Sequence, residues 1–161
     1  MTIKPTIVIG LGNPLMADEG VGTVLVDELA KLALAGKLPA DTIEYLDGGC
    51  GGMYLLHSVA EREKVIFIDC TLMGAEPGTI RRFTPDDVKS VKQMAHLSLH
   101  EVDILKVIEL ARQIGQCPDE IVIFGVEPVK IEPQMHLNDA IAAKIPDYIA
   151  AIETEILSTK S

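Results

Sequence analysis

Short runs of β-branched residues alternate with longer amphipathic patterns along most of this sequence, and this alternation constrains the fold more than any other feature. The predicted strands are 6–10, 42–46, 65–69, 79–83 and 121–126. Between them the apolar residues recur at helical spacing, as Val21, Leu25 and Leu29 do. Strands that alternate with helices form a mostly parallel sheet covered on both faces. We therefore expect a three-layer α/β/α sandwich around a mostly parallel five-stranded sheet.

Details of individual elements can be predicted as well. Arg81 and Arg82 interrupt the apolar pattern of their strand, which is typical of a sheet edge. Helices are expected over 53–62 and 100–114, in addition to the first one and a last one. Asn138 is the predicted N-cap of the last helix, and Pro146 is expected to kink that helix.

Length and composition limit the classes of function. A chain of 161 residues suits one domain, 1–161. It has no run of ~18 apolar residues that would span a membrane and no signal-peptide pattern at its start, so we expect a cytoplasmic protein. Cys50, Cys70 and Cys117 form no CxxC pair and indicate neither a disulfide framework nor a structural zinc site. The formal net charge of −10 argues against a nucleic-acid partner.

The loop after the first predicted strand contains part of a dinucleotide-binding pattern. Gly10 and Gly12 follow a strand and precede a helix, but Leu15 stands where the pattern needs its third glycine. Asp18 and Glu19 lie near the start of that helix, where they would repel a pyrophosphate. Dinucleotide binding is therefore not expected. Taken singly, each carboxylate can also be explained as a first-turn residue that favours the helix dipole.

Ligands of open parallel sheets bind beyond the carboxyl ends of the strands, which here are followed by 12–19, 47–52 and 69–71. Asp69 ends an apolar strand, where a carboxylate is costly unless it is paired, hydrated or metal-bound. His100 begins an amphipathic helix and, taken alone, is better explained as a capping or half-buried residue than as a ligand. Glu19, Asp69 and His100 together would offer two carboxylates and an imidazole to a divalent first-row metal.

Several motifs follow one another in a recognisable order. Gly10-x-Gly-Asn-x-x-x-x-Asp-Glu-x-x-Gly22 resembles the N-terminal signature of the nickel–iron hydrogenase maturation endopeptidases, and Asp47-Gly-Gly-Cys-Gly-Gly-Met53 is similar to that family's glycine-rich loop. Further motifs occur in the family's order: Ile68-Asp69, Pro77-Gly78-Thr79, His100 and Gly125-Val-Glu-Pro128. The resemblance covers nearly the whole chain.

The resemblance implies a function and a site. The family removes a short C-terminal peptide from the precursor of the hydrogenase large subunit after nickel insertion, with the precursor's own nickel as the recognition signal. Glu19, Asp69 and His100 match the three metal-contacting positions, so nickel is the expected cofactor, carried by the precursor. His96 is the alternative histidine, although Leu97-Ser-Leu-His100-Glu matches the family better. Asp69 and Glu19 are the candidate catalytic carboxylates, and Asp69 is favoured as general base.

The glycine-rich loop has two possible roles. Four glycines within 47–52 let the backbone adopt positive φ angles and let another chain approach closely. We expect the loop to bind substrate, and a tight structural turn is the alternative. The residues expected to bind substrate are Asp47, Gly48, Gly49, Cys50, Gly51 and Gly52.

Two other functions compete with this one. A non-enzymatic nickel chaperone could use the same three ligands. Peptidyl-tRNA hydrolases share the string Gly10-Leu-Gly-Asn-Pro14, but they need a histidine–asparagine pair soon after it and a basic face for RNA. Cys70 could serve as a soft ligand, although a small buried residue is the expected role. His57 and His136 are expected to be structural or solvated.

Overall fold

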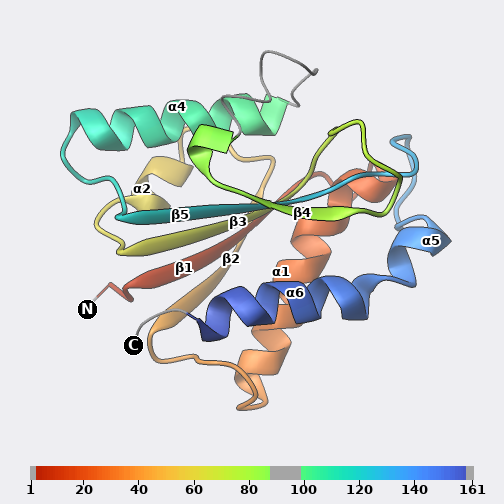
Figure 1. The fold of residues 1–161 in the computed structure, drawn as a ribbon, viewed down its shortest axis with the longest axis horizontal. Helices are drawn as coiled ribbons and strands as arrows, with labels where there is room; N and C mark the ends of the chain where they lie inside the picture. Colours follow the sequence, from red (N-terminus) through yellow and green to blue (C-terminus); the bar gives the residue numbers. More distant parts are fainter. Residues whose placement is uncertain (1–2, 88–98, 159–161) are drawn as a thin grey trace.

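The computed structural model describes residues 3–87 and 99–158. The strands in these residues are β1 (Thr6–Leu11), β2 (Ile43–Gly49), β3 (Lys64–Cys70), β4 (Ile80–Phe83) and β5 (Glu120–Val126). The helices are the 3-10 helix η1 (Ala17–Gly20), α1 (Val21–Leu34), α2 (Leu55–Val59), α4 (Leu99–Gln113), α5 (Asp139–Ala142) and α6 (Ile145–Leu157). The strands form one sheet in the order β2-β1-β3-β5-β4 (Figure 1). All neighbouring strands are parallel except β4 and β5. Strand β4 lies at one edge of the sheet, as predicted.

Helices cover both faces of this sheet. Figure 1 shows α1 and α6 on one face and α2 and α4 on the other. Successive side chains of a strand point to opposite faces, and in β1 Val8 packs on the side of α1 and α6 whereas Ile7 and Ile9 pack on the side of α2 and α4. Every residue of β1 and β3 is buried, as continuous apolar runs predict for central parallel strands. The three-layer α/β/α class is confirmed.

The second strand is longer than predicted. We expected 47–52 to be a loop, but Asp47 and Gly49 belong to β2, where they pair with Gly10 and Leu11 of β1. A register irregularity between Gly10 and Leu11 accommodates this glycine-rich stretch. Glycine has a poor intrinsic preference for strands, and here the pairing with a buried neighbour overrides that preference.

Two helices also differ from expectation. Helix α2 spans only Leu55–Val59, because Ala60 already has an extended backbone. The predicted kink at Pro146 is a complete break between α5 and α6, with Pro146 in the first turn of α6, where its missing N–H is not needed. The prediction for Asn138 is confirmed: its side chain caps α5 by accepting a hydrogen bond from Ala140 N at 3.1 Å. Within the described residues, no helix has the length and apolar character needed to cross a lipid bilayer.

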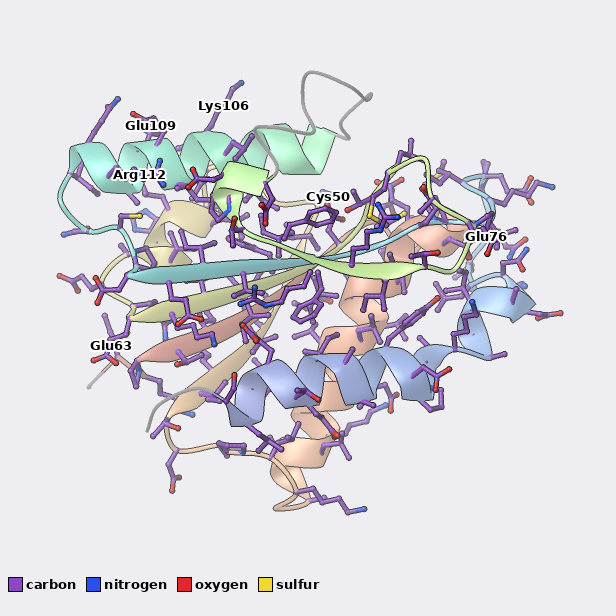
Figure 2. The ribbon with its side chains drawn as sticks, viewed as in Figure 1. Cys50, Glu63, Glu76, Lys106, Glu109 and Arg112 are labelled. Atoms are coloured by element: carbon purple, nitrogen blue, oxygen red, sulfur yellow. The ribbon has the colours of Figure 1, made fainter. Side chains whose placement is uncertain are left out.

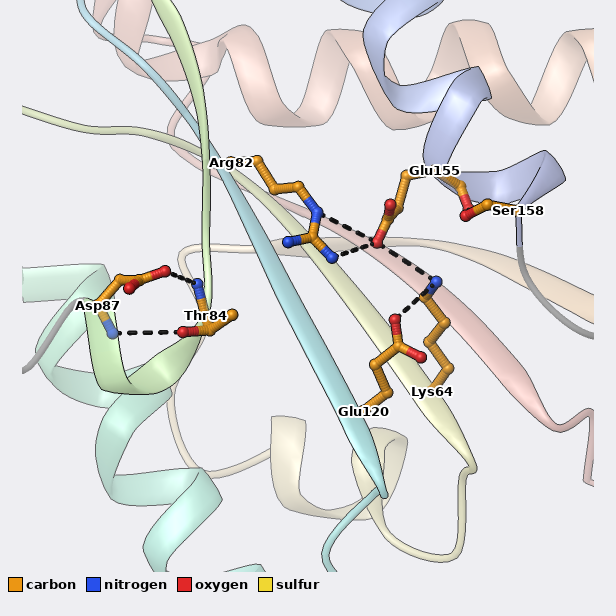
Figure 3. Close-up of polar contacts among 7 residues, drawn as sticks. All are labelled: Lys64, Arg82, Thr84, Asp87, Glu120, Glu155 and Ser158. Carbon is orange, nitrogen blue, oxygen red and sulfur yellow. Dashed lines mark hydrogen bonds and ion pairs between the residues drawn. The ribbon is translucent and has the colours of Figure 1, made fainter.

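A buried ion-pair network lies at the amino end of β3. Lys64 is 5% exposed, and its Nζ lies 3.1 Å from Glu120 Oε1 and 3.3 Å from Glu155 Oε1 (Figure 3). Arg82 donates to the same Glu155 oxygen at 2.8 Å. Burial opposes the charged form of Glu155, but the Arg82 hydrogen bond and the attraction of both cations outweigh it and lower the pKa of Glu155. Glu155 thus ties α6 to β3 and β4.

We expect Glu155→Gln to lower the free energy of unfolding at pH 7 by about 1–3 kcal/mol, because the buried Lys64 keeps only Glu120 as an anionic partner and Arg82 loses its own. A carboxyl whose pKa is lowered by folding stabilises the fold fully above its unfolded pKa of about 4.3, and this contribution is lost as pH falls through the folded pKa. Urea unfolding between pH 3 and 7 should therefore show wild type and variant converging at the acid end.

The matched control for this test is Glu153→Gln on the same helix, because none of the ion pairs among the described residues includes Glu153. Its unfolding free energy should follow that of the wild type at every pH. A constant gap between Glu155→Gln and wild type down to pH 3 would contradict the assigned role.

Candidate active site

Backbone-to-backbone packing sets the start of α1 directly on the carboxyl edge of the sheet. A Cβ on Gly22 would lie 2.2 Å from the carbonyl oxygen of Leu11 and 2.4 Å from that of Ile68. A Cβ on Gly12, whose φ is +143°, would lie 2.0 Å from the carbonyl oxygen of Glu19. These glycines therefore serve close packing. They bring the 3-10 helix η1 against the ends of β1 and β3.

The two neighbouring acids of η1 have different roles. Asp18 is 1% exposed, and its carboxylate accepts hydrogen bonds from the backbone N–H groups of Val129 at 2.8 Å, Lys130 at 2.9 Å and Asn138 at 2.7 Å. Asp18 therefore anchors the segment after β5. Glu19 is only half-buried. Both acids lie in the first turn of η1, which leads directly into α1 at Val21, so they still occupy a position where a carboxylate favours a helix dipole.

Asp69 lies near the end of the central strand β3, beside Gly125 of β5. It is 0% exposed, and its Oδ1 accepts a hydrogen bond from Cys70 N at 2.8 Å. This contact fixes the orientation of the carboxylate at the middle of the sheet. A buried acid held in this way is a candidate for proton transfer or cation binding.

The pKa of the Cys70 thiol depends on the charges near it. Burial raises the pKa of its thiol, and the carboxylates of Asp69, Glu19, Asp18 and Glu127 raise it further. All four acids thus act on one buried point. The thiol stays protonated, as expected for a structural cysteine and not for a soft metal ligand.

Glu127 has a role that the sequence did not predict. It is 4% exposed and follows β5, and its carboxylate accepts hydrogen bonds from the backbone N–H groups of Met73 at 3.0 Å and Ala75 at 2.7 Å. Glu127 therefore holds the loop that follows Asp69. The sequence does show Glu127 as an acid at the end of an apolar strand, as at Asp69. The motif Gly125-Val-Glu-Pro128 does not show which groups the Glu127 carboxylate contacts.

The glycine-rich segment reaches the same edge of the sheet. Gly12 N donates to the carbonyl oxygen of Gly49 at 2.7 Å, which joins it to the first loop. The Asp47 carboxylate accepts from Gly49 N at 2.9 Å, and Cys50 is exposed. Figure 2 shows Glu76, which follows β3, at the opposite end of the sheet from Glu63, which precedes it. The segments after β1 and β2 are therefore joined at this edge of the sheet.

The histidine positions are only partly described. His100 is the second residue of α4, but its side chain lies outside the described parts of the structure, and so does all of His96. Among the side chains that are described, no group of three His, Cys, Asp or Glu residues is arranged to hold a metal ion. Glu19, Asp69 and His100 thus stay a predicted ligand set. His57 and His136 are exposed, as expected for solvated residues.

Comparisons with known proteins agree on one family. The model of a family described as hydrogenase maturation protease matches residues 25–155. A hydrogenase expression/formation protein, HupD, of Rhodobacter capsulatus is 36% identical over 93% of this chain and 70% of its own length. The hydrogenase 2 maturation protease of Escherichia coli is 31% identical over 86% of this chain and 82% of its own. Across four HupD relatives the chain spans 55–74% of the relative's length.

Solved structures show the same likeness. The hydrogenase maturating endopeptidase HybD from E. coli superposes with a TM-score of 0.82 at 28% identity, over 94% of this chain and 91% of that one. The [NiFe] hydrogenase maturation protease HycI from Thermococcus kodakarensis shares the fold, with a TM-score of 0.74 at 21% identity over 97% and 94%.

Proposed function

The chain belongs to the hydrogenase maturation protease family, and from this membership we propose that it removes the C-terminal extension of a nickel-loaded [NiFe]-hydrogenase large-subunit precursor. The observation that carries the proposal is the division of roles among the four acids whose charges raise the pKa of Cys70. Asp18 and Glu127 hold backbone N–H groups of neighbouring loops. Glu19 and Asp69, from the first and third strand ends, are the pair proposed for chemistry.

Nickel enters this proposal as cargo of the substrate. Glu19, Asp69 and His100 would contact nickel that the precursor already holds, because oxygen and imidazole donors suit a divalent first-row metal. The acids around Cys70 make this edge of the sheet electronegative, which favours an approaching cation. The segment 47–52 is proposed to bind the precursor's tail.

Hydrolysis would follow from general base catalysis by a carboxylate, which makes this an aspartic-type peptidase. Asp69 takes a proton from a water molecule as the water oxygen bonds to the scissile carbonyl carbon. The C–N bond then breaks, and the proton that Asp69 took from water passes to the leaving amine. Burial and the hydrogen bond from Cys70 N hold the Asp69 carboxylate in one orientation for this transfer.

The test compares nickel-loaded with nickel-free precursor. The protein is first dialysed against a chelator, so that the only nickel present is the precursor's. We expect mass spectrometry to show a shortened large subunit only in the nickel-loaded sample. Shortening of both samples would exclude nickel as the recognition signal. A change in nickel content without any change in precursor mass would support the chaperone instead.

A further inference from the structure

Large apolar side chains are exposed in the loops after β1, β3 and β5. Leu15 after β1 is 57% exposed, Leu72 after β3 46% and Met135 after β5 81%. We call these three residues the apolar rim. They come from segments far apart in the sequence. The segments of Leu15 and Met135 are joined by a hydrogen bond from Gln134 N to the carbonyl oxygen of Leu15 at 3.0 Å, and the loops of β1, β3 and β5 gather at one end of the sheet in Figure 1. Exposed apolar side chains that gather at one site are typical of an interaction surface.

Acidic side chains accompany this rim. Glu76 is exposed in the loop after β3, and Asp139 is exposed just beyond the segment that contains Met135. The basic residue of the segment after β5, Lys130, already pairs with Glu132 at 3.3 Å. A complementary partner therefore carries apolar residues bordered by lysine or arginine.

A small cavity lies beside the rim. The space between the first loop and the segment around Met135 measures about 30 Å³ and is lined by Pro14, Ala17 and Leu137, among others. It has room for a water molecule but not for a large peptide side chain.

We propose that the apolar rim docks the folded body of the protein substrate, through an apolar face bordered by basic residues, while the tail to be cut reaches Asp69. This inference rests on the proposed function, because it takes the substrate to be a folded precursor. Leu15 precedes Glu19 in the segment after β1, and Leu72 follows Asp69 in the segment after β3, so a protein whose tail enters there must contact the rim. A few well-placed apolar side chains supply most of the affinity of such interfaces.

The experiment measures binding and processing of the nickel-loaded precursor by Leu15→Ser/Met135→Ser. Its matched control is Leu34→Ser/Leu157→Ser, which removes two side chains that are 90% and 66% exposed outside the rim. We expect the rim variant to bind the precursor at least about tenfold more weakly and to process dilute precursor correspondingly more slowly. The control should match the wild type, and both variants should keep the wild-type Tm because the altered side chains already face solvent.

The possible results distinguish failure of the docking inference from failure of the proposed function. Equal binding by the rim variant and the control, with processing intact, would overturn the docking inference and leave the proposed function standing. A wild-type protein that neither binds nor shortens the nickel-loaded precursor would overturn both. Higher salt should weaken wild-type binding if basic residues border the partner's face, and insensitivity to salt would contradict that part of the inference.

Discussion

Asp69→Asn is expected to slow precursor processing by about 10²- to 10⁴-fold, which is the usual contribution of a general base. The asparagine side chain has nearly the same shape but cannot take a proton from water. The fold should survive, because the amide oxygen can still accept the hydrogen bond from Cys70 N that Asp69 Oδ1 accepts now. Removing one of the four negative charges near Cys70 also relieves repulsion.

Asp18→Asn is the control variant that distinguishes an effect on catalysis from an effect on folding. Asp18 accepts three backbone hydrogen bonds through both of its carboxylate oxygens, and an asparagine has only one acceptor oxygen. Asp18→Asn should lower the Tm, whereas Asp69→Asn should not. Time courses of precursor mass and thermal unfolding of both variants test this. Normal shortening by Asp69→Asn would remove Asp69 from the mechanism.

The sequence was sufficient to predict the fold because the relevant forces are local and repetitive. The apolar run before Asp69 predicted a central parallel strand, and β3 is buried along its whole length. The rule that ligands bind beyond strand ends selected the segments after β1, β2 and β3. The structure brings these segments together, through the contact of Gly12 with Gly49 and the packing of Gly22 on Ile68.

The roles of adjacent acids could not be predicted, because they depend on distant segments. Asp18 and Glu19 are indistinguishable by pattern, and only the segment 129–138, more than a hundred residues away, makes Asp18 a structural anchor. Glu127 likewise acquires its role from the N–H groups of Met73 and Ala75. The local sequence also led to a wrong prediction at 47–49, where a loop was expected. Pairing with β1 instead extends β2 through these glycines.

Gly22→Ala is expected to cost about 3 kcal/mol or more of folding free energy, a large effect for a single added methyl group. The new Cβ would lie 2.2 and 2.4 Å from two backbone carbonyl oxygens, of Leu11 and Ile68, and neither β1 nor β3 can move without disturbing the centre of the sheet. The first turn of α1 would be displaced together with Glu19. Urea unfolding should show the loss directly, with little folded protein left to process precursor.

Gly49→Ala is the matched variant that separates packing from recognition. A Cβ on Gly49 meets no atom within 4 Å, and its φ of +56° costs an alanine only about 1 kcal/mol. Gly49→Ala should therefore stay folded, so that weaker precursor binding by this variant would report on the proposed substrate role of 47–52. If it bound and processed precursor as the wild type does, the tight structural turn would be the better explanation of that segment. Equal unfolding free energies for Gly22→Ala and Gly49→Ala would contradict the close packing of α1 on the strand ends.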